Sequence, residues 1–509
     1  MFKKVTDTIK ASWNEKPLQL ILLAGLFFRV LAVLFSKGFG MLDDHFLVIE
    51  QAQTWVDRVD ENNWLINAKK TMEHPDGHSL FYTGLHYFLF RFLEFFGLHD
   101  AQGKMYVVRV LHAAYSMITV YYGYRITEKI AGGKVAKIAG LLLSIFWMFP
   151  FLSVRNLVEV ACIPPLVLAT WLSLKEEKNS FAKYFLIGLL LGISFNIRFQ
   201  AILFAGGFGL ALMFQRKWLA ALTTALSFLI CAAVIQGGSD YVIWNKPFVE
   251  FAEYVRYNIE NANNYYTQPW YNYFILILGM LIPPISFFLL FGFFRNFKKN
   301  LLLFLPSFIF LAFHSYFPNK QERFILPIFP FIIILGTIGW TEFVAQSKYW
   351  RKHPSLLRNF WIFFWTLNTM ALCILSLSYG KRSRVEAMCY IQSQGDASGL
   401  VIEESERNNV NISPRFYLQK WVPVFGVSKE QPLQNLEATL TLTVASLHPN
   451  YVIFYSDKNM EPRLNAMKEV FELEYKATIE PSFIDDVMFR LNPNNVNYTA
   501  FIYKVVKER

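Results

Sequence analysis

Two adjacent carboxylates, Asp43 and Asp44, follow the first long apolar run of the chain, where a hydrophobic span would leave a lipid bilayer. Neither has a basic neighbour in the sequence. Carboxylates at a membrane boundary cost solvation energy, so such a pair indicates a functional site. One of them could accept the proton of a substrate hydroxyl as a general base. The alternative is structural, because Asp is also a favoured N-cap at the start of a helix.

The elements that must position this pair are membrane helices. The chain has 509 residues, of which 54% are hydrophobic and only 17% charged, whereas soluble domains carry about a quarter charged residues. Apolar runs near the spanning length of about 20 residues predict eleven transmembrane helices. Their approximate ranges are 18–36, 105–125, 136–153, 156–174, 183–197, 199–214, 217–237, 270–294, 300–317, 324–345 and 359–380.

The charges in the loops predict the orientation of these helices. If the N-terminus is cytoplasmic, every predicted inside loop is rich in Lys and Arg, as the positive-inside rule requires. The net charge of +11 is therefore a sign of topology, and we expect no nucleic acid partner. This orientation places the loop 37–104 and everything beyond residue 380 outside the cytoplasm.

The segment 381–509 differs from the rest of the chain. Strand-like runs alternate with helical stretches, and acidic and basic residues nearly balance. These features predict a small soluble α/β domain after a membrane domain of residues 1–380, which includes the outside loop 37–104. Since no catalytic motif stands out in this segment, we expect it to recognise the acceptor or to dock a partner.

The predicted outside turns contain four unexpected cations, Arg155, Arg198, Lys320 and Arg323. Any one of them could simply extend toward lipid headgroups. Together they suit an anionic ligand, most simply a phosphate or a diphosphate. The other candidates for substrate binding on this face are His74, Asp76, Glu159, Gln200, Asp240, Tyr266, Trp270 and Glu322.

A metal site has little support in the sequence. His74, Asp76 and His78 supply ligand types, but two-residue spacing in a loop is a weak signal. The four cysteines are scattered, without disulfide or metal spacing. We therefore expect no cofactor, although a divalent metal stays an option.

The order of these motifs resembles the GT-C glycosyltransferases, and most specifically glycosyltransferase family 22, which includes the lumenal dolichyl-phosphate-mannose enzymes. Its first-loop Pro-Asp-Glu motif is similar to residues 42–46, its Arg-x-x-x-Asn/Glu region to residues 155–159, and its Arg before a spanning helix to Arg198. The most specific matches are residues 264–273, similar to Tyr-Gly-x-x-Pro-Trp-x-x-Tyr, and residues 319–324, similar to His-Lys-Glu-x-Arg-Phe.

The chain departs from this pattern at several positions. Asn319 replaces the family His, Gln321 the expected Glu and Tyr266 the Gly. Residues 73–75, Glu-His-Pro, look more like the His-Pro-Pro element of bacterial lipid-phosphosugar transferases. The chain therefore resembles a prokaryotic-type relative of the family.

The resemblance implies an inverting transfer of a hexose, with mannose as the first candidate, from a polyprenyl-phosphate donor to a glycan or lipid-linked acceptor. Asp43 matches the family's catalytic aspartate and would be the general base. Asp44 would orient the acceptor or tune Asp43. Lys320 and Arg323 would hold the donor phosphate with help from Arg198 or Arg155, while Glu159 and Glu322 would pair with the arginines. Trp270 would line the cavity or lie in the interface belt.

The same resemblance implies an integral, multi-pass protein with its active site on the periplasmic or lumenal side, in the plasma membrane of a bacterium or the endoplasmic reticulum of a eukaryote. Two other functions remain open. An oligosaccharide polymerase or ligase would depend on arginines of a large loop and not on Asp43. A lipid or solute transporter would bind its substrate near the midplane, often between internal repeats.

Overall fold

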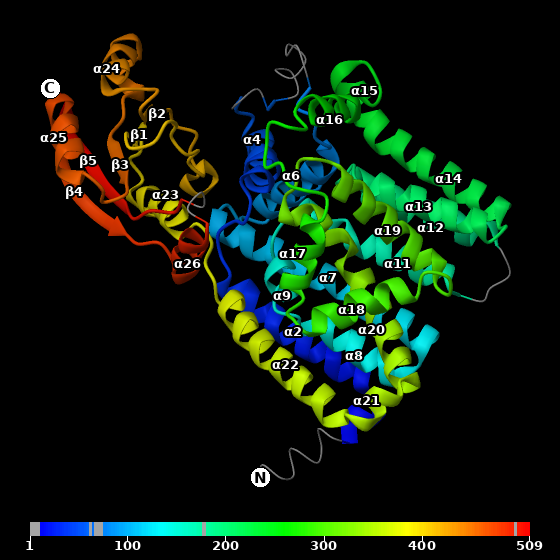
Figure 1. Cartoon of the computed structure of the whole chain (residues 1–509). Coiled ribbons are helices and arrows are strands. Elements are labelled where there is room, and N and C mark those ends of the chain that lie inside the picture. Colours follow the sequence, from blue (N-terminus) through cyan, green and yellow to red (C-terminus); the bar gives the residue numbers. More distant parts are fainter. Residues whose placement is uncertain (1–10, 61–63, 66–74, 176–179, 493–495, 509) are drawn as a thin grey trace. The chain divides into compact units, whose positions relative to one another are not determined.

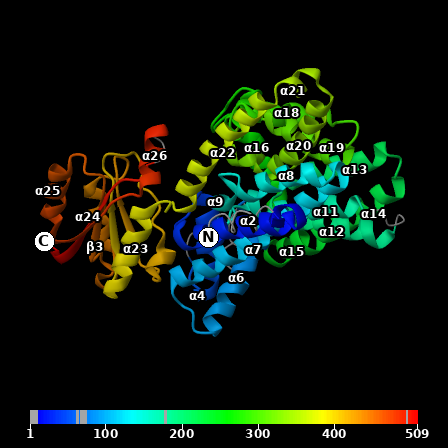
Figure 2. The same cartoon turned by 90° about the horizontal axis from the view of Figure 1, so that it is seen from below.

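The computed structural model describes residues 11–60, 64–65, 75–175, 180–492 and 496–508. The chain is mostly helical, with one small sheet close to its C-terminal end (Figures 1 and 2). It divides into two compact units, each described here by itself. Unit 1 consists of residues 1–33, 65–85 and 108–376, and unit 2 of residues 34–64, 86–107 and 377–509.

Helices make up the described part of unit 1. In chain order they are α2 (Pro17–Phe35), α6 (Leu80–Phe95), α7 (Ala101–Ala131), α8 (Gly133–Ile145), α9 (Phe149–Leu152), α10 (Val158–Ala161), α11 (Ile163–Ser173), α12 (Phe181–Ile197), α13 (Ala201–Phe214), α14 (Trp218–Ala232), η2 (Ala233–Gly237), α15 (Gly238–Trp244), α16 (Val249–Glu260), α17 (Asn272–Met280), α18 (Ile285–Arg295), α19 (Leu301–Tyr316), η3 (Glu322–Ile328), α20 (Phe329–Gln346), α21 (Lys348–Lys352) and α22 (Pro354–Ser376). Parts of α2, α6 and α7 belong to unit 2.

The core of unit 1 is built around α20, in which every residue from Phe329 to Trp340 is buried. Glycines in α20 and in α18 allow these two helices to approach each other very closely. A Cβ atom added at Gly292 would lie 2.1 Å from the Gly336 carbonyl oxygen, so only glycine fits there. Small residues at a helix crossing are typical of membrane helices, where close packing takes the place of the hydrophobic effect.

Every predicted span falls on helical structure, but the count of eleven membrane helices is not confirmed. Among the described residues, four helical stretches are long and apolar enough to cross a membrane: 17–35, 218–244, 322–346 and 354–376. Five further apolar helices are shorter. The predicted span 270–294 divides at Pro283 and Pro284, because proline lacks the N–H that a continuous helix needs.

Unit 2 contains the sheet. Its strands are β1 (Leu400–Glu403), β2 (Val424–Val427), β3 (Tyr451–Tyr455), β4 (Phe471–Ile479) and β5 (Ala500–Glu508). The strand order is β2-β1-β3-β5-β4, with β1 parallel to β2 and β3, and β5 antiparallel to β3 and β4. The helical elements of the C-terminal segment are α23 (Arg382–Gln394), η4 (Arg415–Leu418), α24 (Leu433–Leu442), η5 (Ala445–Leu447), α25 (Met460–Val470) and α26 (Phe483–Leu491).

The predicted α/β character of the C-terminal segment is confirmed. The strand-like runs correspond to β1, β3 and β5, and the helical stretches to α23 and α25. Strands β2 and β4 were not predicted. Unit 2 also takes in residues 34–64 and 86–107, which include most of the predicted outside loop. The domain boundary at residue 380 stays a prediction, because compact packing and independent folding are different properties.

Candidate functional site

Asp43 and Asp44 lie in the first turn of a continuous helical segment formed by α3 (Leu42–Asp44), η1 (His45–Glu50) and α4 (Gln51–Asp57). The N-cap of α3 is Met41, and Asp44, which precedes η1, makes no side-chain capping bond. The capping interpretation of the pair is therefore wrong. Asp43 is exposed, but only 5% of Asp44 is exposed. A carboxylate in the first turn is favoured by the positive end of the helix dipole.

Two buried residues of η1, His45 and Glu50, anchor this helical segment. His45 is stacked between Phe39 and Tyr417, at ring-centroid distances of 4.4 and 5.5 Å, and its Nε2 lies 3.5 Å from Glu50 Oε1. Glu50 in turn accepts a hydrogen bond from the Phe416 amide at 3.0 Å. Glu50 is not among the predicted site residues, although an acidic residue within an apolar stretch is a usable signal. Glu50 lies in η1, which is π-helical, and π-helical turns occur frequently at functional sites.

Two arginines and one glutamate form the central cluster of unit 1. Glu159 in α10 is fully buried. Its Oε1 lies 3.1 Å from a terminal nitrogen of Arg198, at the end of α12, and 3.5 Å from Nε of Arg323, in η3. Glu159 was expected to pair with the arginines, and it does. Glu322 is exposed, and its predicted pairing with an arginine stays a prediction. Two guanidinium groups thus share one carboxylate oxygen.

Each arginine is held in the same way. Arg198 donates to Oε1 of Gln200 at 2.9 Å, and Arg323 donates to Oε1 of Gln321 at 3.0 Å. Both guanidinium groups lie close to the ring of Phe324, at 5.3 and 5.8 Å from its centroid. These contacts fix the direction of both side chains before any ligand arrives.

Tyr254 of α16 adds a donor to the same neighbourhood. Burial raises the pKa of its phenol, and the nearby Gln200 and Arg198 oppose that shift. The hydroxyl therefore stays protonated and can donate a hydrogen bond at neutral pH.

Lys320 does not share this arrangement. Its ammonium group donates to the backbone carbonyls of His314, Ser315 and Phe317, at the C-terminal end of α19. Burial lowers the pKa of Lys320. All three donors thus satisfy carbonyls that a helix end leaves open, so Lys320 has a structural role in this conformation. Arg155 is also buried, with its guanidinium 4.6 Å from the centroid of the Phe151 ring.

The two most specific sequence motifs meet in space. The Lys320 amide donates to the Tyr266 carbonyl at 3.2 Å, and the Gln268 amide donates to the Pro318 carbonyl at 3.2 Å. The Tyr273 hydroxyl donates to the Gln321 carbonyl at 3.1 Å. The segment 264–273 therefore holds the Arg323 loop in place. Trp270 is exposed, as a cavity-wall or interface residue would be.

Asp240, a predicted binding residue, supports the start of α16 in this structure, and its binding role stays a prediction. It is fully buried and accepts hydrogen bonds from Gln236 at 2.8 Å and from the Glu250 amide at 3.1 Å, which stabilises the start of α16. Glu250 accepts in turn from the Gly77 amide at 2.7 Å. Gly77 has φ +71° and lies against the backbone of Tyr254, so a side chain there would be strained.

The remaining candidates are those of the histidine-containing loop. Asp76 is half-buried beside Gly77, and His78 is exposed. His74 lies outside the described residues. Among the residues that the structure describes, no three His, Cys, Asp or Glu side chains gather as a metal site would require.

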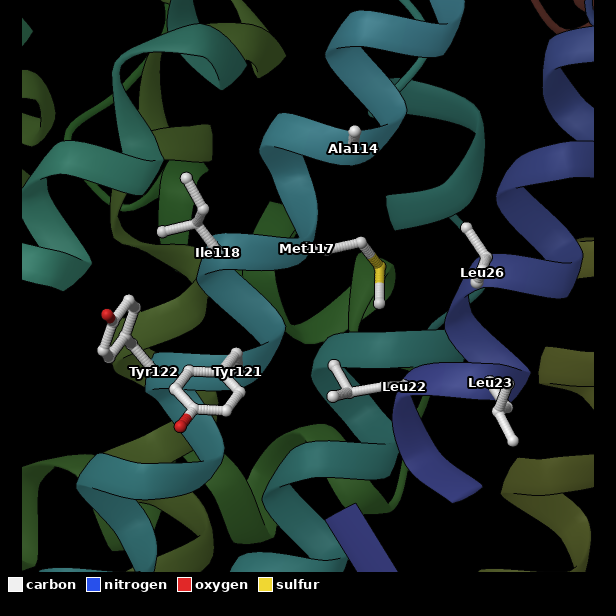
Figure 3. A pocket seen from close by; sticks show the side chains of 8 residues that line it. All are labelled: Leu22, Leu23, Leu26, Ala114, Met117, Ile118, Tyr121 and Tyr122. Atoms are coloured by element: carbon white, nitrogen blue, oxygen red, sulfur yellow. The ribbon is translucent and has the colours of Figure 1, made fainter. Parts of the chain in front are cut away.

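An apolar pocket of about 370 Å³ lies between α2 and α7 in unit 1 (Figure 3). It is lined by Leu22, Leu23, Leu26, Ala114, Met117, Ile118, Tyr121 and Tyr122. Since this lining has no charged side chain, the pocket suits a hydrocarbon chain and not a phosphate or a sugar ring.

Comparisons with known proteins relate this arrangement to one family. Residues 20–411 match the model described as the Alg9-like mannosyltransferase family. The chain is 24% identical to GPI mannosyltransferase 4 of Debaryomyces hansenii over 264 residues, which are 48% of this chain and 47% of the relative. It is 26% identical to alpha-1,2-mannosyltransferase ALG9 of Mus musculus over 207 residues, which are 34% of this chain and 33% of the relative. The chain thus spans half the length of these curated relatives or less.

Solved structures show the fold. ArnT from Cupriavidus metallidurans bound to undecaprenyl phosphate aligns with a TM-score of 0.63 at 12% identity, over 97% of this chain and 98% of ArnT. The Archaeoglobus fulgidus oligosaccharyltransferase in complex with Zn and sulfate aligns with a TM-score of 0.52 at 13% identity, over 90% of this chain and 72% of that one. The helical architecture with its C-terminal sheet is therefore the GT-C fold.

Proposed function

Because the chain belongs to the Alg9-like mannosyltransferase family, we propose that it is an integral membrane enzyme that transfers mannose, or a similar hexose, from a polyprenyl-phosphate donor to a glycan or lipid-linked acceptor. The bond between the sugar C1 and the phosphate oxygen breaks, and its electron pair goes to the phosphate. The acceptor oxygen forms the new bond to C1 from the opposite face, which inverts the anomeric configuration.

The observation that carries this proposal is the pair of arginines around Glu159. Negative charge develops on the leaving phosphate, and Arg198 and Arg323 are oriented in advance to receive it. Glu159 keeps the two cations side by side, and a guanidinium group has the geometry for bidentate contacts to an anion. A solved structure of the same fold supports a lipid phosphate as the ligand class, since ArnT from Cupriavidus metallidurans is bound there to undecaprenyl phosphate.

The proton of the acceptor hydroxyl goes to Asp43. Asp43 is the exposed member of the pair and can reach a substrate, whereas Asp44 is buried and can only position its neighbour. No metal enters this scheme. The oligosaccharide polymerase or ligase and the transporter have no specific observation in their favour.

The donor assay tests the proposal directly. Purified protein in nanodiscs, supplied with radiolabelled polyprenyl-phosphate mannose and a glycolipid extract, should move label into a product with inverted anomeric configuration. Polyprenyl-phosphate glucose measures sugar selectivity, and a nucleotide-activated mannose serves as the negative control. Donor that stays intact with every acceptor, or label that comes from the nucleotide sugar alone, would contradict the proposed function.

The orientation is part of the same proposal, with eleven membrane helices, a cytoplasmic N-terminus and an extracytoplasmic unit 2. Glu430 is exposed, so a Glu430→Cys variant should react with a membrane-impermeant maleimide added from the extracytoplasmic side. The background variant replaces the exposed native Cys373 by Ser. Labelling only after the cytoplasmic face is opened would reverse the topology.

A further inference from the structure

A second, polar pocket lies entirely within unit 2, and the proposed transfer gives it no role. Its volume is about 170 Å³, and its lining comes from α4, the end of α6, the start of α7 and the η4 region of the C-terminal segment. Asp57 and Glu94 contribute carboxylates, Lys104 and Arg415 contribute cations, and Trp421 contributes an aromatic ring.

One wall of this pocket is held by a continuous hydrogen-bond network. Lys104 Nζ donates to Glu94 Oε1 at 2.6 Å and to Gln53 Oε1 at 2.9 Å, and Gln53 Nε2 donates to Asp57 Oδ1 at 3.0 Å. Lys104 and Gln53 are almost completely buried. Burial alone would raise the pKa of Glu94, but hydrogen bonds from Lys104 and Gln53 bring it below its ordinary value. This wall therefore presents acceptor oxygens whose positions are fixed by hydrogen bonds.

The opposite wall belongs to the C-terminal segment. Trp421 Nε1 donates to Asp57 Oδ2 at 2.7 Å, and the guanidinium group of Arg415 lies 5.6 Å from the Trp421 ring centroid. Both side chains are half-buried, so part of each remains open to a ligand. An indole face beside carboxylate and amide groups can cover the C–H face of a sugar ring while its hydroxyls find acceptors and donors.

Charge and size narrow the class of ligand. The two carboxylates balance the two cations, so a phosphate or an ammonium group gains no net attraction and a neutral polyhydroxyl group fits better. A volume of about 170 Å³ lies below the roughly 300 Å³ at which drug-sized sites begin, which leaves room for one ring. We propose that this pocket binds one sugar residue of the acceptor glycan.

The pocket is remote from the reaction. Asp43 lies in the first turn and Asp57 at the end of one helical segment, so the 14 residue steps between them (57 − 43), at about 1.5 Å each, span roughly 20 Å. The bound sugar therefore lies away from the hydroxyl that Asp43 would deprotonate. Such a remote contact selects longer acceptors over short ones. The identity of the ligand as acceptor rests on the proposed function, but sugar binding does not.

Substitution of Trp421 tests the pocket. In Trp421→Ala we expect KM for an α-linked mannotriose acceptor to rise about 10-fold, as the loss of about 1.4 kcal/mol of binding implies. In the same variant, KM for methyl α-mannoside should stay unchanged, as should kcat with either acceptor. Trp421→Phe keeps an aromatic face, so its KM for mannotriose should lie between those of the wild type and Trp421→Ala. Phe483→Ala removes an exposed aromatic side chain of the same unit outside the pocket and should have no effect.

A binding measurement separates this proposal from the proposed function. Ligand-observed NMR of mannotriose with the full chain in nanodiscs, without donor, should show binding that Trp421→Ala weakens and Phe483→Ala does not. That result supports the pocket even if no transfer is found in the wild type. Equal mannotriose binding by wild type and Trp421→Ala would overturn the pocket, as would an equal rise in KM for the short and the long acceptor.

Discussion

Replacement of Asp43 by Asn should lower kcat for mannosyl transfer by about 10²- to 10⁴-fold, the range that a general base contributes. The amide keeps the size of the side chain but cannot accept the acceptor proton. Asp43 is exposed, so the change should cost only the small helix-dipole contribution of its charge and leave the thermal unfolding of the protein nearly unchanged. Transfer of radiolabelled mannose under saturating donor measures the effect.

The chain offers a matched control for this substitution. Asp485 and Asp486 also form a buried and an exposed pair in the first turn of a helix, α26. Asp486→Asn removes an exposed first-turn carboxylate in the same helix-dipole setting, away from the proposed chemistry, and should leave kcat unchanged. Normal transfer by Asp43→Asn would show that the general-base role is wrongly assigned, and a loss confined to Asp44→Asn would transfer it to that residue.

Replacement of Arg323 by Gln should lower kcat by about 10²- to 10³-fold, because one oriented cation that stabilises the leaving phosphate is lost. Arg323→Lys should recover little of this activity, since an ammonium group cannot make the bidentate contact of a guanidinium. Arg256→Gln is the control, because Arg256 in unit 1 is also an arginine in ion pairs with glutamate (Glu253 and Glu260), but at the surface.

The arginine also neutralises a buried carboxylate, and that effect must be separated from catalysis. Glu159 is fully buried, so loss of one partner leaves it incompletely paired and costs stability. The double variant Arg323→Gln/Glu159→Gln removes the excess negative charge and should recover thermal stability but not transfer. If the double variant regained wild-type kcat, Arg323 would act only as the counter-ion of Glu159.

Much of the fold could be predicted from the sequence. Long apolar runs and basic loops indicated membrane helices, and alternation of strand-like and helical stretches indicated the C-terminal α/β segment. The number of membrane spans was harder to predict. A hydropathy pattern continues across prolines such as Pro283 and Pro284, although these prolines divide the helix. Strands β2 and β4 were missed, since short or half-exposed strands leave weak patterns.

The candidate site was predicted as a set of residue types and not as a set of contacts. Arg198, Arg323 and Glu159 were all identified, and their mutual pairing was expected. Lys320 looked equivalent to them in the sequence, yet its donors satisfy the end of α19. Asp240 looked like a binding residue, yet it supports α16. The charge of a loop residue does not reveal whether its side chain will form hydrogen bonds with the open backbone groups of a nearby helix end.

The sequence by itself determined the membrane class and the family, because hydropathy, loop charge and motif order are properties of the linear chain. It also singled out the Asp43–Asp44 pair as a candidate site. Only the tertiary structure decided which of the two carboxylates is exposed, which cations are already committed to backbone carbonyls, and that Trp421 closes a polar pocket with Asp57 and Lys104. Exposure and pairing depend on segments far apart in the sequence, and their contacts exist only after the chain has packed.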